Sequence, residues 1–129
     1  LQAQAQRGEM SEESLRSMRR VYYSPETTLA DLCRFAPLFQ AESRRALLDL
    51  TMLGFRFAGR RPRLPMLVAG GAVDAVFPPA TLSLTAARWQ AEVAVIPGAG
   101  HTLMLDAHWQ VAAERVAQWL EAREKCGAT

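Results

Sequence analysis

Features that mark several whole classes of protein are missing from this sequence of 129 residues. No apolar run approaches the roughly 20 residues that a membrane-spanning helix needs, so we expect no membrane span. The net charge of +2 comes from 15 basic and 13 acidic side chains, and this balance predicts no nucleic-acid partner. The only histidines, His101 and His108, stand apart from any cluster of metal ligands, so we expect no metal site.

Cysteine is also scarce, and Cys33 and Cys126 lack the spacing of a metal-binding motif. We expect both to be free thiols in a reducing compartment, which predicts a cytoplasmic location. The chain begins with Leu1 inside a polar stretch that has neither an initiator methionine nor a signal-peptide pattern. We therefore expect it to be a piece of a longer protein.

The first helical pattern lies near the N-terminus. Leu15, Met18 and Tyr22 recur at spacings of three and four residues, which predicts a helix from about Ser11. The methionines of this region, such as Met10 and Met18, are interpreted as packing residues, with the lining of an acyl pocket as the alternative.

Two further helices are predicted before residue 62. The stretch Ser24-Pro25 is typical of a helix start, and Pro37 should end that helix. Its apolar stripe would consist of Leu29, Leu32, Cys33 and Ala36. The next helix should span about Ala41 to Leu53, with Gly54 at its end.

The pattern changes after residue 62. The continuous apolar run Leu64–Gly71 predicts a strand buried on both faces, and a second strand is expected over Glu92–Ile96. Helices are expected over about Pro79–Arg88 and Ala107–Arg123. The last helix has an apolar stripe at helical spacing, in which Trp119 should be a core anchor: Trp109, Ala112, Ala113, Val116, Trp119 and Leu120.

These patterns predict an α/β fold with two parts. Residues 1–62 would form a helical cap, and residues 63–129 a core of strand, helix, strand and helix. A connection through one helix makes the two strands parallel, so their C-terminal ends lie at the same edge of the sheet. Ligands and catalytic groups gather at that edge in parallel sheets.

One carboxylate and one imidazole follow the two strands. Asp74 lies in the loop after Gly71, and His101 lies in the Gly-rich loop after Ile96. We therefore expect their side chains to meet at the sheet edge. A carboxylate that accepts a hydrogen bond from one ring nitrogen fixes the tautomer and stabilises the imidazolium, while the other nitrogen acts as a general base. Asp74 and His101 are the predicted catalytic residues.

The stretches GAVDAVFPP (residues 71–79) and PGAGHTLML (residues 97–105) resemble the acid and histidine loops of the α/β-hydrolase superfamily. In that family a G-x-x-D-x-x-x-P stretch supplies the acid and a later G-H loop supplies the base. The resemblance covers residues 64–120 well and residues 10–60 loosely. It implies the C-terminal part of the hydrolase fold, no cofactor, and hydrolysis of a small-molecule substrate, an apolar carboxylic ester.

The nucleophile that this family carries in a G-x-S-x-G elbow is missing here. None of the serines has the flanking glycines: Ser11, Ser14, Ser17, Ser24, Ser43 and Ser83. No aspartate or cysteine elbow replaces it, and only the last two strands of the family's sheet are predicted. We therefore expect the chain alone to be inactive, and to need a missing N-terminal portion or to aggregate.

Other interpretations stay open. His108 is expected to be a solvated surface residue, and Asp106 to cap the last helix. The whole chain could instead be a non-catalytic relic that keeps the two loops. It could also belong to a dehalogenase, epoxide hydrolase or peroxidase of the same fold, in which the elbow residue decides the chemistry.

Overall fold

The computed structural model describes residues 10–39, 43–53 and 63–127, with side chains described except at 50–53, 126 and 127. The described part combines helices with one two-stranded parallel sheet, a mixed α/β arrangement. The elements occur in the order α2 (Glu12–Tyr22), α3 (Leu29–Phe35), η1 (Ala36–Leu38), α4 (Arg44–Leu53), β1 (Leu67–Gly71), α5 (Pro79–Trp89), β2 (Glu92–Ile96), η2 (Leu103–Leu105) and α6 (Trp109–Gly127).

Helix α2 begins where the sequence predicts it. The Ser11 hydroxyl accepts a hydrogen bond from the Ser14 N–H at 3.2 Å, which satisfies one of the unpaired amides at the helix start. Leu15 and Met18 are buried, and Met10 packs against their cluster. Met10 and Met18 therefore serve as packing residues.

Helix α3 does not begin at Ser24-Pro25, so that prediction was wrong. It begins at Leu29, where the Thr28 hydroxyl caps the helix by accepting from the Asp31 N–H at 3.1 Å. Ser24 is instead fully buried, and its N–H donates to Asp106, so its backbone is tied to a distant loop rather than to a helix. The α-helix ends at Phe35, before Pro37, and continues as the short 3-10 helix η1.

Only part of the predicted α3 stripe is buried. Leu32 and Ala36 lie in the core with Leu15, Met18 and Tyr23, whereas Leu29 and Cys33 are exposed. Cys33 is a free thiol, as predicted. The side chain of Cys126 and the position of Gly54 lie outside the described residues.

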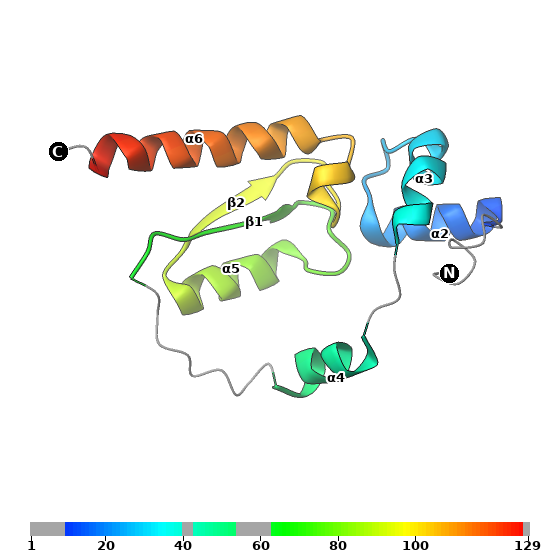
Figure 1. Ribbon diagram of the computed structural model, residues 1–129, viewed down its shortest axis with the longest axis horizontal. Coiled ribbons are helices and arrows are strands. Elements are labelled where there is room, and N and C mark those ends of the chain that lie inside the picture. The colour runs from blue at the N-terminus through cyan, green and yellow to red at the C-terminus, as the bar shows by residue number, and fades with distance from the viewer. Residues whose placement is uncertain (1–9, 40–42, 54–62, 128–129) are drawn as a thin grey trace.

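The two strands are parallel and in matched register, as predicted. Gly71 pairs with Ile96, so both strands end at the same level. Helix α5 lies on one face of the sheet and α6 on the other (Figure 1). A Cβ at Gly70 would lie 2.4 Å from Leu82 of α5, whereas Ala94 and Ile96 pack with Ala112 of α6. Residues on alternate sides of the strands thus meet different helices.

The strand predicted over Leu64–Gly71 begins only at Leu67, Leu64 is 76% exposed, and β1 is fully buried only at Gly70 and Gly71. The second strand is also partly open. Val93 and Val95 on β2 are 37% and 40% exposed, so β2 is not covered on both faces. A parallel strand is buried on both faces only where neighbouring strands and helices cover it, and β2 has one neighbouring strand in the described part.

The apolar stripe of α6 is divided in the same way. Ala112 is buried and Trp119 is half-buried, whereas Trp109, Val116 and Leu120 are exposed. The exposed side chains and Met104 line an apolar groove of about 500 Å³ along α6. The described sheet is too narrow to cover the whole stripe, so the prediction that Trp119 is a core anchor is confirmed only in part.

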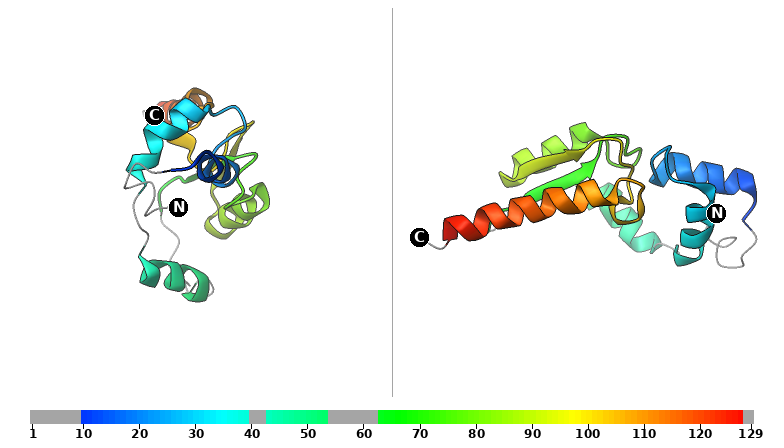
Figure 2. Two further views of the ribbon diagram at one scale, coloured as in Figure 1. Left: turned by 90° about the vertical axis from the view of Figure 1, so that its right-hand side faces the viewer. Right: turned by 90° about the horizontal axis from the view of Figure 1, so that it is seen from above.

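Helices α2 and α3, which together with the turn between them we refer to as the cap, lie beside the loops at the C-terminal edge of the sheet (Figures 1 and 2). Helix α4 lies apart from them. Every described side chain of α4 is exposed. The division into a cap of residues 1–62 and a core of residues 63–129 stays a prediction. None of the described helices combines the length and the apolar character that crossing a membrane requires.

Candidate functional site

The loops that follow β1 and β2 meet, as predicted. Their backbones are joined by two hydrogen bonds, from the Ala72 N–H to Ile96 O at 2.9 Å and from the Val73 N–H to Ala99 O at 3.0 Å. Because the strands end in register, these bonds place the acid loop and the histidine loop side by side. Asp74 Oδ2 lies 3.0 Å from His101 Nδ1, which confirms the expected contact.

The turn around Asp74 orients its carboxylate. Oδ1 accepts hydrogen bonds from the N–H groups of Val76 at 2.7 Å and Phe77 at 2.8 Å. Such turns are typical of aspartate, whose short side chain reaches the backbone two or three residues ahead. The side chain is only 4% exposed, so Oδ2 is held toward the imidazole with little access to water.

The His101 ring lies between the cap and the acid loop. Its centroid is 5.4 Å from that of Phe77 and 6.0 Å from that of Tyr22, and the side chain is 29% exposed. The next residue, Thr102, donates two hydrogen bonds to Tyr22 O, from its N–H at 2.9 Å and its hydroxyl at 2.6 Å. The histidine loop is thereby fixed to the end of α2.

The two glycines before His101 have different structural roles. Gly98 has φ +73°, the left-handed region in which other residues are strained. Gly100 does not adopt that region. A Cβ at Gly100 would lie 2.5 Å from Tyr23 C, so Gly100 is required by the close approach of the cap backbone.

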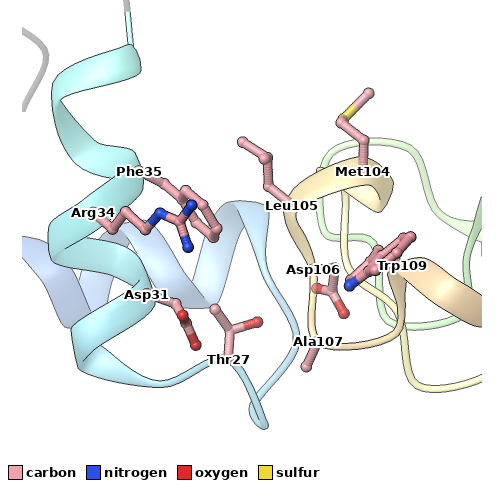
Figure 3. A pocket seen from close by; sticks show the side chains of 9 residues that line it. All are labelled: Thr27, Asp31, Arg34, Phe35, Met104, Leu105, Asp106, Ala107 and Trp109. Carbon is pink, nitrogen blue, oxygen red and sulfur yellow. The ribbon is translucent and has the colours of Figure 1, made fainter.

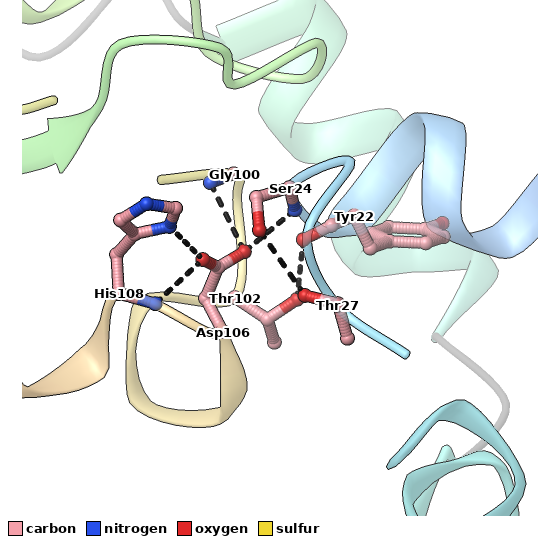
Figure 4. A network of polar contacts seen from close by, with 7 residues as sticks. All are labelled: Tyr22, Ser24, Thr27, Gly100, Thr102, Asp106 and His108. Atoms are coloured by element: carbon pink, nitrogen blue, oxygen red, sulfur yellow. Dashed lines mark hydrogen bonds and ion pairs between the residues drawn. The ribbon is translucent and has the colours of Figure 1, made fainter. Parts of the chain in front are cut away.

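A second aspartate–histidine pair lies a few residues further along the same loop (Figure 4). Asp106 Oδ2 accepts hydrogen bonds from the Ser24 N–H at 2.6 Å and the Gly100 N–H at 3.2 Å. Its Oδ1 accepts from the His108 N–H at 3.0 Å and lies 3.1 Å from His108 Nδ1. We refer to these four residues as the Asp106 network.

The Asp106 carboxylate is ionised deep inside the protein. Burial acts to raise the pKa of Asp106, but the hydrogen bonds from His108, Ser24 and Gly100 outweigh it and hold the pKa below its ordinary value. A buried carboxylate is stable only when such donors compensate for its lost hydration.

One prediction about this region was wrong, and another was incomplete. His108 is not a solvated surface residue, because its side chain is only 28% exposed and pairs with Asp106. Asp106 does more than cap α6, because its carboxylate joins the cap to the histidine loop. The spacing Asp-x-His was visible in the sequence, but the partner Ser24 lies 82 residues away and only packing reveals it.

A cleft of about 370 Å³ lies between α3 and the segment that leads into α6 (Figure 3). Asp31, Arg34 and Phe35 of α3 form one wall of this cleft. The opposite wall is formed by Met104, Leu105 and Trp109. Neither Asp74 nor His101 lines the cleft, so it is distinct from the Asp74–His101 pair.

Ser24 lies against the histidine loop but is not placed to act as a nucleophile. The Ser24 N–H bonds to Asp106, yet the Ser24 side chain is fully buried, and its hydroxyl lies 3.2 Å from Thr27 Oγ1. Among the residues that the structure describes, no group of three or more His, Cys, Asp or Glu side chains could hold a metal ion.

Comparisons of the chain with protein-family profiles, with curated proteins and with solved structures found no match. The residues of the site and their geometry are therefore the basis for its chemistry.

Proposed function

We propose that this chain carries the acid and the base of a Ser-His-Asp hydrolase of the α/β-hydrolase type, acting on carboxylic esters. The observation that carries the proposal is the contact of Asp74 Oδ2 with His101 Nδ1 at 3.0 Å, across 27 residues of sequence. Asp74 is further fixed by two backbone N–H groups, so the carboxylate is oriented independently of the ring.

This arrangement suits a general base. A carboxylate at Nδ1 favours the tautomer with the proton on Nδ1, which leaves the lone pair of Nε2 for proton abstraction. His101 would take the proton of a serine hydroxyl as its oxygen attacks the ester carbonyl, and would return it to the departing alcohol. Water would then cleave the acyl-enzyme by the same proton transfers, with Asp74 stabilising the imidazolium in both steps.

The surroundings of His101 favour an apolar substrate. The Phe77 ring lies beside the imidazole and is 40% exposed, and Val76 and Val73 in the same loop are 38% and 48% exposed. Exposed apolar side chains next to a polar reacting group are typical of sites that bind an alkyl or aryl group. We therefore propose an apolar ester as the substrate class.

The proposal places the nucleophile outside these 129 residues. It also assigns the uncovered side of α6 and the open edge of the sheet to contacts with the rest of a larger sheet, which would bury Val116 and Leu120. The DNA that precedes the codon for Leu1 tests this directly. A strand followed by G-x-S-x-G supports the esterase, G-x-D the dehalogenase or epoxide-hydrolase alternative, and a stop codon the relic.

The activity test uses the natural polypeptide that contains this segment, with p-nitrophenyl butyrate as the substrate. His101→Ala should lower kcat/KM on the order of 10³-fold or more, and Asp74→Asn should lower it by a similar factor. Asp31→Asn is the matched control, because it makes the same chemical change at the start of α3, and it should leave kcat/KM unchanged. Full activity of His101→Ala would disprove the base assignment.

A further inference from the structure

We propose that Asp106 is a positioning residue for His101: its buried carboxylate fixes the backbone that presents the imidazole to Asp74. This inference rests on the proposed function and adds a residue to it. Asp106 does not contact the His101 ring, and acts instead through Gly100, the residue directly before His101.

The hydrogen bonds of Asp106 reach two separate segments of backbone. Asp106 Oδ2 accepts from the Gly100 N–H on one side and the Ser24 N–H on the other, so one oxygen joins the histidine loop to the cap. Thr102, directly after His101, is bonded to Tyr22 O at the end of α2. The backbone is thus held on both sides of His101 against the same turn of the cap.

The backbone of the histidine loop packs tightly against the backbone of the cap at Gly100. A Cβ at Gly100 would lie 2.5 Å from Tyr23 C and 2.9 Å from Ser24 N, so the two backbones touch with no side chain between them. Asp106 is 1% exposed, so water cannot replace its oxygens without opening the loop. Losing the carboxylate would leave two buried N–H groups unpaired, which is costly and drives the backbone to move.

His108 holds the Asp106 carboxylate in its orientation. It donates from its backbone N–H and lies within hydrogen-bonding distance through Nδ1, both at Asp106 Oδ1. This fixes the rotation of the carboxylate and keeps Oδ2 directed at the two amides. His108 therefore belongs to the support of Asp106, and the proposal gives it no contact with substrate.

The test reads the tautomer of His101 by nitrogen-15 NMR of the natural polypeptide that contains this segment, labelled at histidine. These 129 residues contain two histidines, and the signals missing in His101→Gln and in His108→Gln assign the two rings. The spectra are recorded at increasing alkaline pH until the signals of the ring no longer change. The shifts of its two nitrogens then report which one carries the proton.

We expect the wild-type His101 ring to carry its proton on Nδ1, facing Asp74. In Asp106→Asn the ratio of the Nδ1–H to the Nε2–H tautomer should fall about three- to tenfold, because the displaced ring loses its bond to Asp74. Asp106→Glu keeps the charge but moves it by one methylene, and should give a smaller change in the same direction.

Leu15→Ala separates positioning from general loosening. Leu15 is buried in the cap core and should cost about 2–5 kcal/mol of stability when truncated, yet it belongs to neither aspartate–histidine pair. Its folded state should keep the wild-type tautomer ratio. A change in Leu15→Ala equal to that in Asp106→Asn would overturn the positioning role.

The remaining outcomes are also decisive. If Asp106→Asn gives no folded spectrum, the tautomer ratio of His101 is measured in Asp106→Glu and interpreted in the same way. Wild-type ratios in the folded Asp106 variants would overturn this inference and leave the proposed function standing. A wild-type His101 without preference for the Nδ1–H tautomer would count against the proposed function itself.

Discussion

The protein contains two aspartate–histidine pairs of nearly equal length and different surroundings. Asp74 and His101 are 3.0 Å apart and come from two loops 27 residues apart in sequence, whereas Asp106 and His108 are 3.1 Å apart and lie two residues apart. The Asp74 carboxylate is held by its own turn, and the two imidazoles are about equally exposed, His101 at 29% and His108 at 28%. The Asp106 carboxylate joins the cap to the histidine loop.

The partners of the carboxylate decide what an aspartate–histidine pair can do. Asp74 accepts from two backbone amides of its own turn, and its other oxygen contacts the His101 ring. Asp106 accepts from backbone amides of two segments that lie far apart in sequence, at Ser24 and Gly100. The first geometry suits proton transfer and the second suits support, and each prediction below tests this contrast.

The largest stability effect is expected from Asp106→Ala. It leaves the N–H groups of Ser24 and Gly100 buried without an acceptor and should cost about 3 kcal/mol of unfolding free energy. Asp74→Ala should cost about 1 kcal/mol, because the freed amides belong to a loop with exposed side chains and can be hydrated. Urea unfolding measures both. Equal losses would erase the distinction between the pairs.

A smaller loss of unfolding free energy is expected when alanine replaces either glycine of the histidine loop. Gly100→Ala places a methyl group against the Tyr23 backbone and should cost about 2 kcal/mol. Gly98→Ala strains a left-handed residue and presses on the His108 ring, which should cost about 1 kcal/mol. Thermal melts show which variant loses more stability. A larger loss for Gly98→Ala would mean that the contact of Gly100 with the Tyr23 backbone is not the tighter one.

Acid should weaken the contribution of Asp106. Its pKa is lower in the folded chain than the ordinary value of 3.8, so the unfolded chain binds the proton more tightly. The stability from Asp106 is therefore complete above the ordinary pKa and is lost as the pH falls through the folded pKa. The difference in urea midpoint between the wild type and Asp106→Asn should be constant from about pH 6 down to about pH 4, and shrink below it. A difference that grows on acidification would contradict the lowered pKa.

The smallest stability effects are expected from the two imidazoles. His108→Gln should cost about 1 kcal/mol, because one donor to a buried carboxylate is lost. His101→Gln should cost about 0.5 kcal/mol or less, because Asp74 keeps its two backbone donors. Differential scanning calorimetry of the two variants measures the contrast. A larger loss for His101→Gln would assign the first pair a structural role.

Much of the architecture follows from local sequence patterns. The spacing of Leu15 and Met18 predicts α2, and the apolar runs that end at Gly71 and Ile96 predict the strands. The contact of Asp74 with His101 is also predictable, because parallel strands joined through one helix must end at the same edge. These signals act over one turn or one strand, so neighbouring residues suffice to read them.

Other features could not be read from local patterns. Ser24-Pro25 has the composition of a helix start, yet the Ser24 N–H binds Asp106, and the helix begins at Leu29. The α6 stripe has the right period, but the period does not say how much of it the sheet covers. The absence of a G-x-S-x-G pattern around any serine can be read directly from the sequence.

The sequence by itself determined the order of helices and strands, the parallel pairing and the meeting of the acid and histidine loops, because each depends on short-range periodicity and chain connectivity. Only the tertiary structure decided that Asp106 joins Gly100 to Ser24 and that His108 supports it. The reason is physical: a buried carboxylate takes whichever donors packing brings within reach, and one of these lies 82 residues away in the chain.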